Sequence, residues 1–312
     1  MSAPFIEVVV PTYNRCAMLD RLIASLLNQS YPADRYRLIV VDDGSSDETW
    51  KALETWAARE PRVKPLHIQH GGASAARNHG WRSGTADIIA FTDDDCVADR
   101  QWLHELARGF AERPQALGFY GKTLTEPAQV TPLTYQIVAQ RPNSNYRTCN
   151  IAYRRKSLID AEGFDEKSAY GEDAQLAADV LTRGPILFWP AAIMIHPPRP
   201  RIFLDADAWQ IQLEGLFRLY SRQPMFFRRH WGRYFPIAVA WRLGIGSTAK
   251  QALSLRRWIA RDPALYGKFL RLLIRERSML LKILPRFWHA HRKGHGGIQT
   301  SEAGGPAGSR NL

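Results

Sequence analysis

The chain has 312 residues, 45% of them hydrophobic, and 42 lysines and arginines against 30 aspartates and glutamates, which gives a formal net charge of +12 at pH 7. This hydrophobic fraction excludes a disordered protein, and the length suits one large domain with an appendage or two domains. No stretch approaches the roughly 18 to 20 apolar residues that span a bilayer, and the N-terminus lacks the pattern of a secretory signal, so we expect a cytoplasmic protein.

Strand and helix patterns alternate through the first hundred residues. Apolar, β-rich runs predict strands at residues 6–12, 36–43, 63–68 and 87–95. After the first strand, leucines and one isoleucine recur on one helix face, at Leu19, Leu22, Ile23, Leu26 and Leu27. Ser45 and Glu48 have the spacing of a capping box that opens a second helix, and a third helix covers residues 74–84. This order predicts an α/β fold with a mostly parallel sheet flanked by helices.

The rest of the chain divides into three parts. Strands are expected at 117–124, 148–155 and 186–196, and helices at 156–162 and 172–182. We therefore predict a catalytic domain over 1–198, a basic, amphipathic helical region over 199–293, and a disordered, Gly-rich tail over 294–312.

Positive charge is concentrated in the helical region. Residues 1–198 hold 21 basic and 24 acidic residues, whereas residues 199–293 hold 20 and 5. Basic helices rich in aromatic residues are typical of a membrane interface, so residues 208–293 predict contact with an anionic membrane surface. The alternative is that the aromatic side chains pack against the catalytic domain while the arginines are solvated.

Polar residues follow each of the first four predicted strands. Parallel strands bring their carboxyl ends to one edge, where ligands bind, so these residues should face one crevice: Thr12, Tyr13, Asn14, Asp42, Asp43, Gly71, Gly72, Asp93, Asp94 and Asp95. The first turn, "PTYNR", lacks the glycines of a dinucleotide-binding fold, which argues against NAD. Asp93 and Asp95 instead suit Mg²⁺ or Mn²⁺, which could bridge a substrate diphosphate.

Six motifs occur in order along residues 5–198: "VVVPTYNR", "VVDDGSSDET", "GGASAARNHG", "FTDDDC", "NIAYRR" followed by "EGFDE", and "YGEDAQL". In this order the chain resembles family 2 glycosyltransferases with the GT-A fold. It lacks the QxxRW-like motif and the membrane spans of processive members, so the resemblance implies a non-processive enzyme that makes single transfers.

The resemblance assigns roles to individual residues. It implies a donor site in which Pro11 or Tyr13 stacks on the nucleobase and Asp43 accepts a hydrogen bond from it. The full set of expected donor-binding residues is Pro11, Thr12, Tyr13, Asn14, Asp43, Arg77, Asn78, Asp93 and Asp94. A divalent metal, Mn²⁺ or Mg²⁺, is expected on Asp95, Asp93 and His196, although a lone histidine such as His196 can equally be structural.

The segment "GEDAQL" supplies the expected catalytic residues, Asp173 and Glu172. Inverting transfer needs a base that takes the proton of the acceptor hydroxyl, and a helix N-terminus favours the ionised carboxylate of such a base. Asp173 is the predicted base and Glu172 its support, with simple helix capping as the alternative for both.

The sequence therefore predicts an inverting glycosyltransferase that uses a nucleotide-diphospho-sugar, with UDP expected as the nucleotide. The expected acceptor is a hydroxyl of a glycan or lipid-linked molecule of the cell envelope, reached from the inner face of the cytoplasmic membrane. Two other functions stay open. A sugar nucleotidyltransferase should have a Gly-rich basic loop after its first strand, which "PTYNRCAML" does not supply. A non-catalytic basic protein that binds nucleic acid or membrane would leave the acidic crevice unexplained, so no nucleic acid partner is expected.

Overall fold

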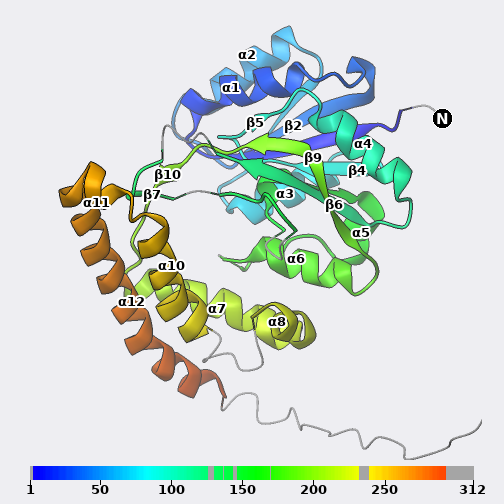
Figure 1. The fold of residues 1–312 in the computed structure, drawn as a ribbon. Helices are drawn as coiled ribbons and strands as arrows, with labels where there is room; N and C mark the ends of the chain where they lie inside the picture. The colour runs from blue at the N-terminus through cyan, green and yellow to red at the C-terminus, as the bar shows by residue number, and fades with distance from the viewer. Residues whose placement is uncertain are drawn as a thin grey trace, which may run out of the picture.

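The computed structural model describes residues 3–125, 130–135, 137–142, 146–168, 170–231 and 239–292, and an eight-stranded sheet forms its centre (Figure 1). The strand order is β3-β2-β1-β4-β8-β6-β9-β5. The bounds are β1 Ile6–Thr12, β2 Tyr36–Asp42, β3 Val63–His67, β4 Ile88–Phe91, β5 Val97–Ala98, β6 Gly118–Leu124, β8 Ile151–Arg154 and β9 Ile186–Ile195. Two short strands, β7 (Thr134–Tyr135) and β10 (Arg199–Pro200), pair separately. The predicted α/β fold with a mostly parallel sheet is confirmed.

The first four strands are parallel and place their carboxyl ends together. In β1, Ile6 pairs with Tyr36 of β2 on one side and with Ile88 of β4 on the other. Every residue of β1 is buried, which explains its continuous apolar run, because helices cover both faces of a parallel sheet. The loops after β1, β2 and β4 therefore meet at one edge.

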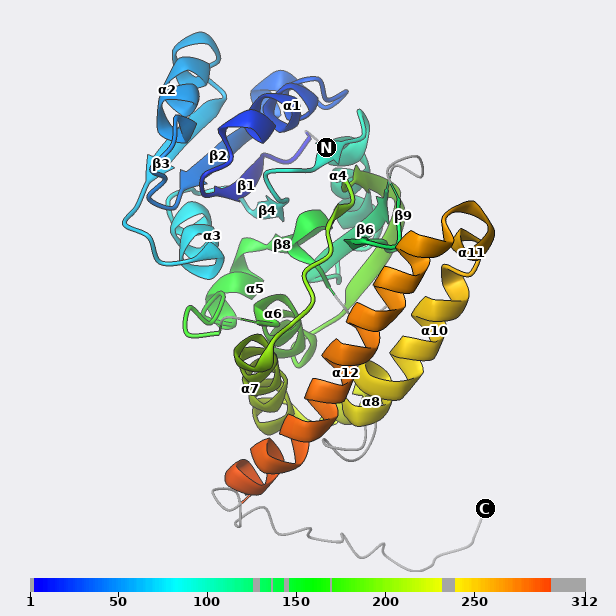
Figure 2. The same ribbon diagram turned by 90° about the vertical axis from the view of Figure 1, so that its left-hand side faces the viewer.

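One helical layer covers each face of the sheet (Figures 1 and 2). The helices α1 (Cys16–Leu27), α2 (Thr49–Arg59) and α4 (Trp102–Glu112) bury leucines in one core cluster, for example Leu22, Leu53 and Leu106. On the other face, α3 (Ala73–Arg82), α5 (Arg155–Asp160) and α6 (Glu172–Leu181) contribute to a second cluster. Both layers follow from apolar stripes at helical spacing.

A buried glutamate lies inside this apolar frame. Glu7 on β1 is fully buried, and its carboxylate accepts hydrogen bonds from Arg37 (2.9 Å) and Arg155 (2.8 Å). The backbone N–H groups of Thr85 and Ala86 donate to the same carboxylate, each at 3.2 Å. Glu7 thus ties β1 to β2, α5 and the loop before β4, and a buried charge of this kind is tolerated only with such partners.

The second half of the sheet delivers the end of β9 to the site. The pairing of β6 with β9 shifts register between Gly121 and Lys122, and the Asn150 side chain donates to the carbonyls of Lys122 (3.0 Å) and Ala192 (3.1 Å) across the irregularity. A Cβ on Gly121 would lie 1.9 Å from the Ala192 oxygen, so the strands approach this closely only because residue 121 is glycine.

The helical region packs around its own aromatic core. Its helices are α7 (Ala206–Arg222), α8 (Pro224–Trp231), the π-helical segment η4 (Ala240–Ile245), α10 (Gly246–Ser254), α11 (Trp258–Arg261) and α12 (Pro263–Arg292). Most of the aromatic side chains that suggested a membrane face are buried, as Trp209, Phe217 and Phe269 illustrate. The aromatic part of that argument is therefore wrong, because these side chains build the inside of the helical region. Among the described residues, no helix is long and apolar enough to cross a membrane.

Some boundaries differ from the sequence predictions. The capping box at Ser45 is wrong: Ser45 hydrogen-bonds to Asp42, and the cap residue of α2, Glu48, makes no side-chain cap. The division at residue 198 stays a prediction, and β10 lies just beyond it, paired with β7 through Arg199 and Tyr135. The predicted disordered tail, 294–312, lies outside the described residues.

Candidate active site

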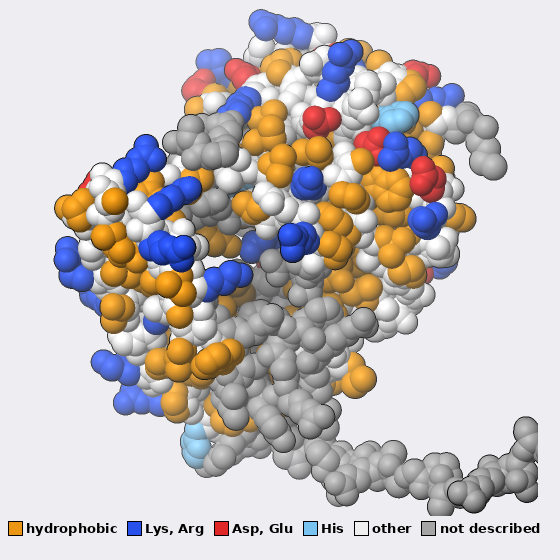
Figure 3. All heavy atoms as spheres, viewed as in Figure 1, with side chains coloured by type: hydrophobic (Ala, Val, Ile, Leu, Met, Phe, Trp, Pro, Cys, Tyr) orange, Lys and Arg blue, Asp and Glu red, His pale blue; other side chains and the backbone are white. Residues whose placement is uncertain are grey.

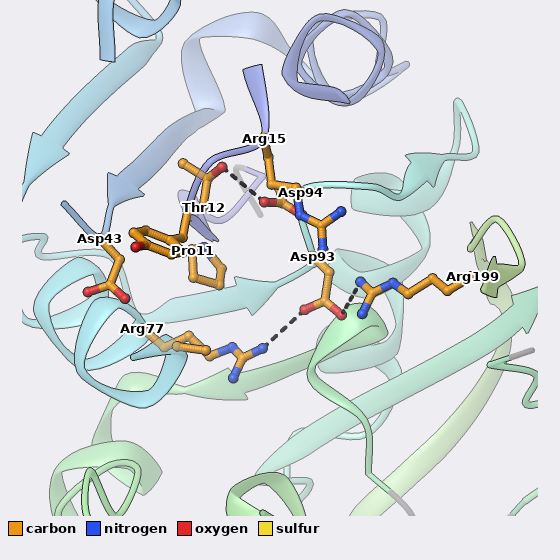
Figure 4. A pocket seen from close by; sticks show the side chains of 10 residues that line it. Pro11, Thr12, Arg15, Asp43, Arg77, Asp93, Asp94 and Arg199 are labelled. Atoms are coloured by element: carbon orange, nitrogen blue, oxygen red, sulfur yellow. Dashed lines mark hydrogen bonds and ion pairs between the residues drawn. The ribbon is translucent and has the colours of Figure 1, made fainter. Parts of the chain in front are cut away.

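A cavity of about 270 Å³ opens at the carboxyl ends of β1, β2 and β4 (Figure 4). Seven of the nine predicted donor-binding residues line it: Pro11, Thr12, Tyr13, Asp43, Arg77, Asp93 and Asp94. Arg15, Ala73 and Arg199 complete the lining. The crevice expected from the parallel sheet is therefore present, with cations among its carboxylates.

The loop after β1 gives the cavity an exposed aromatic ring. Tyr13 is 42% exposed and stacks on His70, with ring centroids 4.3 Å apart. Asn14 does not line the cavity. It adopts φ 52°, and its side-chain oxygen accepts hydrogen bonds from the backbone N–H groups of Ser46 (2.8 Å) and Asp47 (3.4 Å). Asn14 thus fastens the first loop to the loop after β2, and its expected direct contact with the donor stays a prediction.

Asp43 is held rigidly at the end of β2. The N–H groups of Gly71 and Gly72 donate to its two carboxylate oxygens at 2.8 and 2.9 Å, and His70 Nδ1 lies 2.9 Å from the same carboxylate. Gly72 has φ 89°, a conformation that glycine adopts without strain. Gly71 donates to Oδ1, whereas Gly72 and His70 both lie against Oδ2, so Oδ1 can still accept a hydrogen bond from a ligand.

Arg77 and Asn78 are neighbours on α3 with different surroundings. The Arg77 guanidinium bonds Asp93 (3.1 Å) and Glu172 (3.2 Å), and its side chain is buried. The Asn78 amide donates to Phe164 O and Glu166, and its oxygen accepts from Phe164 N and the Trp81 indole. These four bonds use its full capacity and hold residues 164–166, while its expected contact with the donor stays a prediction.

The three adjacent aspartates have three different environments. Asp93 faces Arg77, and Arg199 Nη2 approaches it to 3.9 Å (Figure 4). Asp94 accepts a hydrogen bond from Thr12 Oγ1 at 2.9 Å, and burial raises its pKa to about 6. Burial would also raise the pKa of Asp95, but the hydrogen bond from Arg199 and the charge of that arginine outweigh it and hold the pKa below the usual range. Asp95 is therefore held in its charged form.

The residues around Asp95 fit a divalent cation. His196 is fully buried, and its Nδ1 lies 2.8 Å from the carbonyl of Pro197, which can only accept, so Nδ1 carries the proton. The other ring nitrogen, Nε2, has no hydrogen-bond partner in the described part of the chain and lies 3.5 Å from Asp95 Oδ1. Ligand atoms of Asp95, Cys96 and His196 all lie within 4.8 Å of one another. Burial, the first of several causes, raises the pKa of the Cys96 thiol well above its usual value, which leaves the carboxylate and the imidazole, a donor set suited to Mn²⁺ or Mg²⁺. Asp93 lies outside this close group and pairs with arginines instead.

The predicted catalytic pair lies at the start of α6, next to the cavity rather than in its lining. Gly171 adopts φ 76° before the helix, and Asp173 accepts a hydrogen bond from the Ala174 N–H at 2.7 Å. Burial raises the pKa of Asp173 to about 7, the charge of Glu172 adds to this effect, and Arg147 and Arg77 partly oppose it. Asp173 thus has the pKa of a group that exchanges protons near neutral pH.

Three arginines at the site were not predicted, and one of them, Arg15, lines the cavity. Arg199 pairs with Asp95, and Arg147, whose Nη2 donates to the Tyr135 hydroxyl at 3.0 Å, acts electrostatically on Asp173. The only sequence signal was indirect: buried carboxylates at one edge require cations nearby, but nothing local identifies which arginines supply them.

Comparison with known proteins identifies one family. The family model "Glycosyl transferase family 2" matches residues 7–161. Glycosyltransferase AglE of Haloferax volcanii is 33% identical over 101 residues, which cover 32% of this chain and 33% of that protein. The chain spans about a third to a half of the length of the first curated relatives it matches.

Solved structures agree with the fold. S. aureus TarS 1–349 in complex with UDP-GlcNAc matches with a TM-score of 0.59 at 17% identity. The match covers 93% of this chain and 92% of the TarS chain. The mannosyltransferase PcManGT from Pyrobaculum calidifontis, in complex with GDP-Man and Mn²⁺, matches with a TM-score of 0.58 at 18% identity. The match covers 94% of this chain and 88% of the PcManGT chain. The chain belongs to glycosyltransferase family 2 and has the GT-A fold.

Proposed function

We propose that the protein is an inverting, non-processive glycosyltransferase that moves a sugar from a nucleotide-diphospho-sugar to an acceptor hydroxyl. The observation that carries this proposal is the buried Nε2 of His196, which has no hydrogen-bond partner in the described part of the chain and faces Asp95. Asp95 in turn pairs with Arg199, which lines the cavity together with Asp43 and Asp93. Family membership and the nucleotide-sugar complexes of the two structural neighbours support the same donor class.

The donor occupies the cavity in this proposal. The nucleobase lies beside Pro11, Thr12 and Tyr13, because an exposed aromatic ring offers it a stacking surface. Asp43 accepts a hydrogen bond from the base, which favours a ring with an N–H donor such as uracil, so a UDP-sugar is the proposed donor.

The diphosphate lies toward the aspartates. Asp95 and His196, with Asp93 close by, are the residues that would hold Mn²⁺ or Mg²⁺. Such a cation supplies charge stabilisation for a leaving diphosphate. Arg77, buried between Asp93 and Glu172, orients both carboxylates and adds positive charge where the diphosphate departs.

Asp173 removes the proton of the acceptor hydroxyl. As that proton moves to the carboxylate, the acceptor oxygen forms its bond to the anomeric carbon, and the bond from this carbon to the diphosphate breaks on the opposite side. Glu172 raises the proton affinity of Asp173 through its charge, and its bond to Arg77 fixes the start of α6. We propose an acceptor that is a glycan or a lipid-linked molecule of the cell envelope, with the protein at the cytoplasmic face of the membrane through residues 208–293.

Thermal unfolding tests the donor site without knowledge of the acceptor. UDP, GDP, CDP, ADP and dTDP are each added with Mn²⁺ or with chelator. A nucleotide at 100 times its Kd stabilises the folded state by about 2.7 kcal/mol, which raises Tm by several degrees. We expect one nucleotide, UDP, to act only with metal. Asp95→Asn should abolish the metal dependence, and the matched variant Asp173→Asn should keep it. Absence of any nucleotide effect on the wild type would contradict the proposal.

A further inference from the structure

The outer side of α12 carries a row of cations. Five basic side chains, which we call the α12 basic ridge, are exposed there: Lys268, Arg271, Arg275, Lys282 and Arg286. At 100° per residue they fall within an arc of about 60°, and at 1.5 Å per residue the ridge is about 27 Å long. Within the described part of the chain, none of the five forms an ion pair with a carboxylate. The single acid of α12, Glu276, is buried and accepts a hydrogen bond from Leu204 N.

The ridge is not needed to hold the helix in place. The opposite face of α12 supplies that attachment, because Phe269, Leu273, Leu280, Leu284 and Phe287 are buried in the cores of the helical region. Five like charges in one row repel one another, so their alignment costs stability and requires another explanation.

Exposed apolar side chains, which we call the apolar flank, accompany the ridge. They are Trp241 (62% exposed), Ile245 (56%), Leu253 (60%), Ile259 (54%), Ile274 (59%) and Leu281 (40%). A Cβ added to Gly244 of η4 would lie 3.3 Å from the side chain of Leu281 of α12, so the flank residues of these two elements lie near one another. Figure 3 shows hydrophobic and basic side chains interleaved over the helices on the left of the molecule.

We propose that the α12 basic ridge and the apolar flank form the surface that lies on a bilayer containing anionic lipid. The ridge gives charge complementarity to phosphate headgroups, and the flank gives side chains that gain by leaving water, a combination typical of interfacial helices. Nucleic acid would satisfy the ridge but would leave the aliphatic side chains in water. This inference names the surface that makes the membrane contact of the proposed function. It rests on the proposed function only where it places a lipid-linked acceptor near that surface.

The position of α12 suits such an acceptor. In Figure 2, α12 and the connection from β9 to α7 both lie in front of the sheet. Phe203 in that connection packs against the core formed by Tyr266 and Phe269 of α12, so the two segments are in contact. The same connection carries Arg199, which lines the donor cavity. A bilayer along the outer side of α12 would therefore be separated by this helix from the connection that leads to the active site.

Vesicle flotation of the full chain tests the inference. The vesicles contain phosphatidylcholine alone or phosphatidylcholine with phosphatidylglycerol, at low and at high salt. Each basic residue near an anionic leaflet contributes about a fivefold gain in partitioning, so Arg271→Gln/Arg275→Gln/Lys282→Gln should lower binding about a hundredfold. The matched variant Arg59→Gln/Arg100→Gln/Lys167→Gln removes the same charge from exposed positions of the catalytic part and should bind as the wild type does.

Each outcome decides the inference. It is overturned if the wild type does not bind anionic vesicles at low salt, or if both triple variants lose binding equally. Preferential binding to duplex DNA that displaces the vesicles also overturns it. Trp241→Ser/Leu253→Ser should weaken binding at high salt, where the charges are screened. The ridge variant should keep the nucleotide-dependent rise in Tm, so a failed donor site and a failed membrane surface give different results.

Discussion

The raised pKa of Asp173 makes a directional prediction about the pH dependence of transfer. A base acts only when it is ionised, and with a pKa of about 7 Asp173 is about one tenth ionised at pH 6 and about nine tenths ionised at pH 8. The rate at saturating donor should therefore rise about tenfold per pH unit below 7 and level off above it. Release of nucleoside diphosphate from the donor, with water in place of the acceptor, measures this rate.

Two variants should move the inflection in opposite directions. Glu172→Gln removes the negative charge that raises the pKa of Asp173, so its profile should shift to lower pH. Arg147→Gln removes a positive charge that lowers this pKa, so its profile should shift to higher pH. At pH 6, an inflection one pH unit lower raises the rate about fivefold, and an inflection one pH unit higher lowers it about tenfold. A wild-type profile that is flat between pH 6 and 8, or two variants that shift in the same direction, would refute the assignment of Asp173 as the base.

Three further predictions concern the metal, the fold and the nucleotide. Arg199→Gln should tighten Mn²⁺ binding in the absence of nucleotide, because Arg199 and the cation compete for Asp95. The EPR signal of free Mn²⁺ measures this binding, and weaker binding would count against a cation at Asp95. Glu7→Ala should lower the free energy of unfolding in urea by about 3 to 5 kcal/mol, since it leaves buried charges unpaired, and a loss below about 1 kcal/mol would contradict that reasoning. Tyr13→Ala should weaken nucleotide binding by about 1 to 3 kcal/mol in calorimetry if its ring stacks on the base, and unchanged affinity would exclude stacking.

The central sheet could be predicted because its strands carry strong local signals. A buried parallel strand such as β1 is apolar throughout, and α1 repeats its leucines at helical spacing. The helix α4 was missed although Trp102, Leu106 and Phe110 do recur at helical spacing. The strands β7 and β10 have only two residues each, and a segment of that length has no period to detect.

The site was predicted as far as strand ends determine it. The aspartates after β2 and β4 follow directly from the topology of the sheet. The hydrogen-bond partners of Asn14 and Asn78 could not be predicted from the sequence. The partner of an amide depends on which backbone folds against it, and residues 164–166 reach Asn78 from far along the chain. Arg147 and Arg199 are equally dependent on long-range folding.

The short strand β10 affects how shortened versions of the protein should be interpreted. A chain that stops at residue 198 loses the helices, but it also loses Arg199, its pairing with Tyr135, and the counter-charge of Asp95. Loss of nucleotide binding in that version would not reveal whether the helices matter to the donor. A chain that ends at residue 204 keeps these contacts, so a comparison of the two lengths separates the contribution of residues 199–204 from that of the helical region.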